Sequence, residues 1–112
     1  MNAVADKLRE ARALIERGFV KERYAFGKRR YVDPASKYAL CFCSLGAISR
    51  VTGADTLHVP FTDEAKRLAA VIDGTSGDVF CDIIEWNDAP ERTQAEVLAA
   101  FDRAIELAES EQ

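Results

Sequence analysis

The three cysteines and the single histidine are the side chains of this sequence best suited to chemistry. Cys41 and Cys43 fall near the start of a predicted helix, where the positive end of the helix dipole would lower the pKa of a thiol. His58 could act as the base for such a thiol, and Asn87 or Asp88 could orient its ring. One interpretation is therefore a thiol-dependent hydrolase or transferase with Cys43 as its nucleophile.

A structural role explains the same side chains more simply, and we favour it. Cysteine is among the most buried residue types and behaves as a small hydrophobic side chain. The sequence around Cys43 also lacks the glycine-rich surroundings of known cysteine protease nucleophiles. We therefore predict no catalytic residues. Of the first two cysteines, Cys43 is the better candidate because Gly46 and Ala47 lie one turn further along the helix.

A zinc site is a further interpretation, with Cys41, Cys43, His58 and Cys81 as its ligands. Two helical residues separated by one position point about 200° apart, because each residue turns the helix by about 100°. The chain also has no Cys-x-x-Cys pair, the spacing that is typical of structural zinc sites. We therefore predict neither a metal site nor a cofactor.

Residues 21–31 combine basic and aromatic side chains, among them Tyr24, Phe26 and Tyr31. That pattern can hold phosphates and stack bases. The whole chain, however, has a formal net charge of −4, which argues against nucleic acid or an anionic membrane as the main partner. A partner with an acidic surface, including a second copy of this chain, fits the same charges.

The composition is that of an ordinary globular protein. Its 112 residues, 48% of them hydrophobic and 30% charged, predict a single domain over residues 1–112. No apolar run approaches the roughly 18 residues of a membrane span, and the charged N-terminus lacks the apolar centre of a signal peptide. An odd number of cysteines favours a reduced compartment, so we expect a cytoplasmic protein.

Hydrophobic periodicity and capping residues predict the elements that must position these side chains. Five segments have the spacing of a helix: residues 3–17, 38–52, 62–74, 78–86 and 93–108. The fourth is also compatible with a strand, because it contains a β-branched run. Residues 19–33 are expected to form a small hairpin that turns at Gly27-Lys28. The predicted fold is mainly α, with four to five helices around one core, and an α+β fold is the alternative.

Two short segments indicate where these helices meet. Gly46 inside a helix costs about 1 kcal/mol relative to alanine, which indicates close packing or a site. Asn87 and Asp88 favour the end of a helix, and Pro90 prevents that helix from continuing. We expect this corner to dock beside the small residues near Gly46. A pocket between the two segments is the alternative.

The segments Cys43-Ser44-Leu45-Gly46-Ala47 and Trp86-Asn87-Asp88 give the chain a resemblance to a family. It resembles an uncharacterised family of short bacterial and phage proteins, a domain of unknown function. Members carry an amphipathic first helix, a Cys-x-x-Gly-Ala helix and a Trp-Asn-Asp or Phe-Asn-Asp corner before the final helix. The resemblance implies no established activity. It implies that five residues line one feature, either a packing junction or a small pocket: Cys43, Gly46, Trp86, Asn87 and Asp88.

The function that the sequence favours is a small cytoplasmic interaction or accessory protein that self-associates and has no catalytic activity. The alternative is the thiol-dependent enzyme, with Cys43, His58 and either Asn87 or Asp88. A weaker alternative is a phage or regulatory protein that contacts nucleic acid through the basic 21–31 hairpin.

Overall fold

The computed structural model describes residues 2–74 and 76–111. It confirms a mainly α fold with a small antiparallel pair of strands. The elements in chain order are α1 (Ala3–Arg17), β1 (Ala25–Phe26), β2 (Cys41–Phe42), α2 (Ser44–Thr52), the 3-10 helix η1 (Val59–Phe61), α3 (Asp63–Val71), α4 (Val79–Asp88) and α5 (Gln94–Ser110). No helix among the described residues is long and apolar enough to cross a bilayer.

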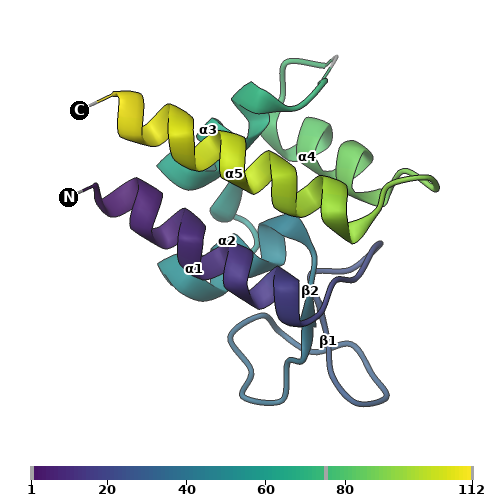
Figure 1. Cartoon of the computed structure of the whole chain (residues 1–112). Helices are drawn as coiled ribbons and strands as arrows, with labels where there is room; N and C mark the ends of the chain where they lie inside the picture. Colours follow the sequence, from purple (N-terminus) through teal and green to yellow (C-terminus); the bar gives the residue numbers. More distant parts are fainter. Residues whose placement is uncertain (1, 75, 112) are drawn as a thin grey trace.

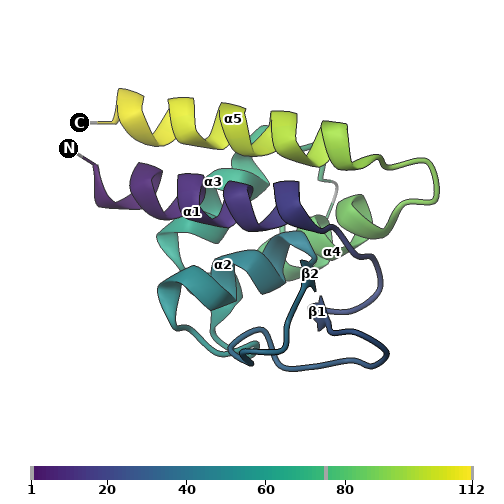
Figure 2. The ribbon, with the colours of Figure 1, turned by 60° about the horizontal axis from the view of Figure 1, so that its bottom comes forward.

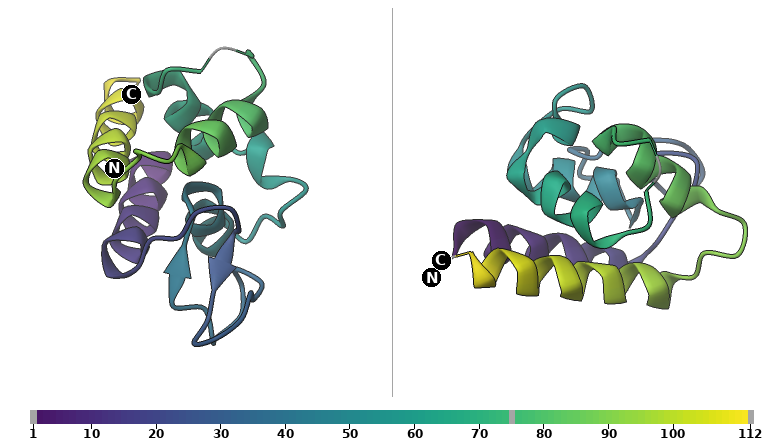
Figure 3. Two further views of the ribbon diagram at one scale, coloured as in Figure 1. Left: turned by 90° about the vertical axis from the view of Figure 1, so that its right-hand side faces the viewer. Right: turned by 90° about the horizontal axis from the view of Figure 1, so that it is seen from above.

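The two longest helices, α1 and α5, lie side by side and run in opposite directions, so the start of α1 and the end of α5 are neighbours (Figures 1 and 2). The shorter helices α2, α3 and α4 form a second layer that covers one side of this pair (Figure 3). The core lies between the layers, and its largest fully buried side chains include Phe101, Leu8, Ile15 and Leu45. Each of these occupies the apolar stripe of its helix, which is why the periodicity predicted these helices.

Side-chain caps set where the helices begin. Asn2 accepts a hydrogen bond from the amide of Ala5, and Thr93 and Glu96 form the expected capping box at the start of α5. The ambiguous segment 78–86 is helical, because Asp78 accepts a hydrogen bond from the amide of Cys81 and starts α4. The preferred prediction for that segment is confirmed.

The small sheet has a different partner strand from the one expected. β1 pairs with β2, whereas the expected return strand at Tyr31 contributes one isolated bridge to Phe26. The expected turn does form, since the amide of Gly27 donates to the carbonyl of Arg30 (2.8 Å) and the amide of Val32 donates to the carbonyl of Ala25 (3.4 Å), but the return segment makes only this one bridge. Pairing with β2 instead buries Phe42.

The predicted helix over residues 38–52 is shorter in the structure, because residues 38–40 are irregular, β2 occupies Cys41–Phe42 and α2 begins at Ser44. Within α2, a Cβ on Gly46 would overlap the backbone carbonyl of Tyr24. Gly46 therefore allows the chain just before β1 to lie directly against α2. This close approach is the packing reason expected for a glycine inside a helix.

Candidate binding groove

Cys43 is a buried residue that caps α2. Its Sγ accepts a hydrogen bond from the amide of Gly46 (3.2 Å), and the side chain is only 1% exposed. Burial raises the pKa of the thiol from 9.0 to about 11, and the amide hydrogen bond from Gly46 opposes this only in part. The thiol is therefore protonated at neutral pH, which is the opposite of what a thiol nucleophile requires.

His58 lies on an exposed loop just before η1. Its ring Nδ1 lies 2.6 Å from Oδ1 of Asp55, and the same oxygen accepts the backbone amide of His58 (2.9 Å). His58 lines neither of the hollows beside Tyr24 that are described below. It makes no hydrogen bond to Cys43 within the described residues. The structure does not bring together the thiol and the base of the enzyme interpretation.

Asn87 is fully buried and connects α4 to α2. Its Oδ1 accepts hydrogen bonds from both the amide (2.9 Å) and the hydroxyl (2.6 Å) of Ser44, the first residue of α2. Its amide group donates to Oδ1 of Asp88 (2.9 Å), and that oxygen also accepts the amide of Glu22 (2.9 Å). Asn87 therefore satisfies a free donor at the start of a helix 43 residues earlier in the chain.

Trp86 lies in a different place from Cys43. Its ring is stacked by the guanidinium of Arg92 at 4.4 Å, and Nε of Arg92 donates to the Trp86 carbonyl (2.8 Å). Trp86 lines a hollow with Asp73, whereas Cys43 lines another hollow with Asp88. Of the five residues that the resemblance brings together, Cys43, Asn87 and Asp88 lie at the junction of α2 and α4. Gly46 packs against the backbone of Tyr24, and Trp86 lines the separate hollow.

The residues proposed as zinc ligands have different surroundings. Cys41 is half-buried in β2, Cys43 is buried, and Cys81 is exposed on α4, where Asp78 accepts its amide. Across residues 2–74 and 76–111, no three His, Cys, Asp or Glu side chains are grouped in a way that could hold a metal ion.

The hollow beside Cys43 opens into a larger groove. The inner hollow has a volume of about 150 Å³, and the outer hollow has a volume of about 490 Å³. Tyr24 and Phe80 line both, so the two hollows adjoin. We call them together the groove. Its inner part is lined by Glu22, Arg23, Tyr24, Cys43, Phe80, Ile84 and Asp88. Its outer part is lined by Tyr24, Thr56, Leu57, Pro60, Phe61, Lys66, Gly77, Asp78, Val79 and Phe80.

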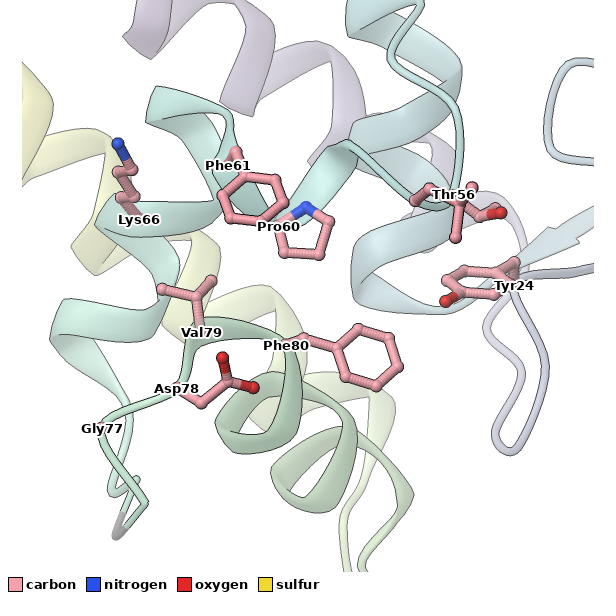
Figure 4. A pocket seen from close by; sticks show the side chains of 10 residues that line it. Tyr24, Thr56, Pro60, Phe61, Lys66, Gly77, Asp78, Val79 and Phe80 are labelled. Atoms are coloured by element: carbon pink, nitrogen blue, oxygen red, sulfur yellow. The ribbon is translucent and has the colours of Figure 1, made fainter.

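The outer part of the groove is mainly apolar. Pro60 and Phe61 of η1 face Val79 and Phe80 of α4 across it (Figure 4). Leu57 and Phe61 are 78% and 72% exposed, and with Phe80 they form an exposed apolar cluster, which is more informative than a single exposed apolar side chain. Neither residue belongs to a pattern that predicted a site from the sequence. The available signal was the run Leu57 to Phe61, whose apolar residues lie between two helices and belong to no helical stripe.

The inner wall of the groove contains a residue in an unfavourable conformation. Glu22 has a φ of 66° and is the one non-glycine residue with positive φ among those the structure describes. This left-handed conformation costs roughly 1–2 kcal/mol for a residue with a Cβ. The hydrogen bond from its amide to Asp88 (2.9 Å) holds it there. Residues in such conformations tend to cluster at functional sites.

The comparisons with known proteins give a family and no activity. Residues 1–107 match a family model described as a family of unknown function, DUF6197. No curated protein and no solved structure matches the chain. The geometry of the groove is therefore the basis for a functional proposal.

Proposed function

Given that the chain belongs to the DUF6197 family of unknown function, we propose that it is a non-catalytic interaction protein whose partner is a second copy of itself. The observation that carries the proposal is the exposed apolar outer part of the groove, formed by Leu57, Phe61 and Phe80 around a hollow of about 490 Å³. Clusters of large exposed apolar side chains mark interaction surfaces, whereas scattered ones do not.

The energetic argument follows from exposure. Removing apolar surface from water contributes roughly 25 cal/mol for each Å². Leu57 and Phe61 leave most of their surface in water in the isolated chain, and they lie beside a hollow with apolar walls. Association through this face would bury both the side chains and the walls. A few well-buried apolar anchors are typical of the residues that dominate binding energy.

The shape and the charge of this face fit a second copy. Leu57 and Phe61 project beside the hollow, so two copies related by a two-fold axis could each place these side chains against the hollow of the other. Lys66 and Asp78 lie on opposite walls of the groove (Figure 4). The two-fold arrangement would place Lys66 of one copy near Asp78 of the other, which gives a self-complementary rim.

The state of Cys43 supports the absence of catalysis. The thiol is buried and its pKa is raised to about 11, and the groove has no histidine in its lining that could deprotonate it. A protonated thiol without a base is a poor nucleophile.

Light scattering on purified protein from about 10 μM to 1 mM tests the proposal, with an expected dimer dissociation constant in the micromolar range. Leu57→Ser should raise this constant at least about tenfold, because it removes an apolar anchor from the interface. Leu40→Ser is the matched control, since Leu40 is also an exposed leucine (58%) and lies outside the groove. It should change the constant less than about twofold.

Two results would contradict the proposal. A chain that stays monomeric at about 1 mM has no second copy as its partner, and the groove would then belong to a different protein. Equal weakening by Leu57→Ser and Leu40→Ser would show general apolar adhesion instead of docking at the groove.

A further inference from the structure

The charges of this acidic chain are strongly segregated. Residues 17–50 contain eight basic and two acidic residues, whereas the rest of the chain contains seven basic and 17 acidic residues. The ion pairs within residues 2–74 and 76–111 all lie outside this basic segment. None of the eight basic side chains of residues 17–50 therefore forms an ion pair with a carboxylate in the described part of the chain.

Three of these cations line one hollow. Arg17 at the end of α1, Lys37 before β2 and Arg50 in the last turn of α2 border a space of about 220 Å³. The rest of the lining is apolar and includes no carboxylate: Leu14, Ala39, Leu40 and Phe42. We call this space the basic pocket.

The pocket is held by a network of turns. Nη1 of Arg50 donates to the carbonyls of Pro34 (2.9 Å) and Ser36 (2.7 Å), which fixes the guanidinium against the segment that carries Lys37. Asp33 supports the same segment, because its carboxylate accepts the amide of Ala35 (2.8 Å). The other nitrogens of Arg50 make no hydrogen bond within the described residues, so they are available as donors.

Helix dipoles account for only part of this arrangement. The C-terminal end of a helix favours a nearby cation. This explains why Arg17 lies at the end of α1 and, separately, why Arg50 lies at the end of α2. Lys37 lies on neither helix. The dipoles also do not explain why three like charges line one hollow, where they repel one another. An anion bound among them would relieve that repulsion.

We infer that the basic pocket binds the phosphate group of a small molecule. Two guanidinium groups and an ammonium supply the donors and the charge that suit a phosphate dianion. A volume of about 220 Å³ lies below the roughly 300–1,000 Å³ of pockets for larger ligands. Leu40 and Phe42 offer apolar contact to a small organic group that carries the phosphate. This inference uses residues outside the groove and is independent of the proposed self-association.

Calorimetric titration at low ionic strength, with inorganic phosphate, phenyl phosphate and phenol as probes, tests the inference. Phenyl phosphate should bind one per chain and more tightly than inorganic phosphate, because its ring adds apolar contact. Phenol should bind far more weakly, since it carries no phosphate. If inorganic phosphate instead matches phenyl phosphate, the pocket recognises the free ion, and the inferred organic ligand is wrong.

The decisive comparison uses two double variants with the same change in charge. Arg17→Gln with Lys37→Gln should weaken phenyl phosphate binding at least about tenfold, because both charged contacts are lost. Lys28→Gln with Arg29→Gln removes two cations of the same segment that do not line the pocket, and it should weaken binding less than about twofold. Arg50 stays unchanged in both variants because it holds the turn at Ser36.

Three further outcomes would overturn the inference. The first is the absence of saturable binding of either phosphate probe. The second is equal weakening in the two double variants, which would show general attraction to a basic segment. The third is binding of phenol as tight as that of phenyl phosphate, which would make the space a simple apolar cavity. Thermal unfolding of both variants checks that the fold is retained, and Lys37→Gln alone repeats the test if the double variant unfolds.

Discussion

The junction of α2 with α4 and the groove beside it share a wall, yet their side chains have opposite surroundings. At the junction, Asn87 and Ser44 are fully buried, and hydrogen bonds connect their polar groups. In the groove, Leu57 and Phe61 are large and apolar, and most of their surface is exposed. Water is excluded from the polar groups and covers the apolar ones.

This difference shows that the type of a residue does not by itself determine its role. Cys43 and Asn87 are residue types that enzymes use, but here one caps a helix and the other joins two helices. Leu57 and Phe61 have no chemistry of their own, but they are the side chains with surface left to bury. We infer that the junction stabilises the fold and that the groove is where association occurs.

The largest effect should come from breaking the junction. Asn87→Ala leaves the amide and the hydroxyl of Ser44 buried without their acceptor. The expected loss in the free energy of unfolding is about 2–4 kcal/mol, from unsatisfied buried donors and a lost helix cap. Urea denaturation followed by circular dichroism measures it.

The only other asparagine provides the matched control. Asn2 also caps a helix and its amide group donates to the carbonyl of Ala108 (2.7 Å), but it is only half-buried at the start of α1. Asn2→Ala should therefore cost only about 1 kcal/mol. Equal losses in the two variants would show that the buried junction is no more important to stability than the half-buried bonds of Asn2.

The junction also shows what a sequence can and cannot predict. The capping box of Thr93 and Glu96 was predictable because its groups lie three residues apart. The bond from Ser44 to Asn87 joins residues 43 apart, and the docking of their helices decides it. Chain order likewise could not reveal that His58 turns to Asp55 and not to Cys43.

Strand pairing and the exposure of side chains could not be predicted from local sequence patterns for the same reason. The turn after Gly27 forms as expected, but the strand that pairs with β1 is β2, which lies further along the chain and which no local pattern connects to β1. The exposure of Leu57 depends on what the folded chain leaves uncovered, and no periodicity records that. Local signals therefore predicted the helices, and tertiary contacts determined the groove.

The labelling rates of buried Cys43 and exposed Cys81 with a thiol reagent test the same difference in surroundings. The expected effect is smaller than that of Asn87→Ala. In folded protein at pH 7.5, Cys81 should react at least about a hundredfold faster than Cys43, because access to Cys43 requires local opening. Peptide mass spectrometry of the unmodified sequence can follow each cysteine separately. Labelling of Cys43 as fast as Cys81 would revive the thiol enzyme interpretation.

The pKa of Cys43 adds a pH dependence with a definite sign. Its ordinary value is 9.0, and burial raises it to about 11 in the folded chain. The unfolded chain therefore loses this proton first as the pH rises, and ionisation favours unfolding. The stabilisation from the neutral buried thiol is fully present below about pH 9 and is lost between about pH 9 and 11.

The smallest effect should come from the wall of the groove and should have the opposite sign. Glu22→Gly relieves the left-handed conformation, which costs roughly 1–2 kcal/mol, but glycine also makes the unfolded chain more flexible by about 0.5–1 kcal/mol. The net gain in the free energy of unfolding should be about 0.5–1 kcal/mol. Urea denaturation at pH 7 measures it.

Glu91→Gly makes the same chemical change at an exposed residue whose φ is not positive. It should lose about 0.5–1 kcal/mol, because only the effect on the unfolded chain remains. A loss in the free energy of unfolding in both variants would show that the backbone of Glu22 is not strained. A gain for Glu22→Gly with a loss for Glu91→Gly would show that the conformation of Glu22 lowers the stability of the chain. The hydrogen bond from the Glu22 amide to Asp88 at the junction would then be what holds that conformation. The two regions would be coupled: the buried hydrogen bonds of one hold the shape of the other.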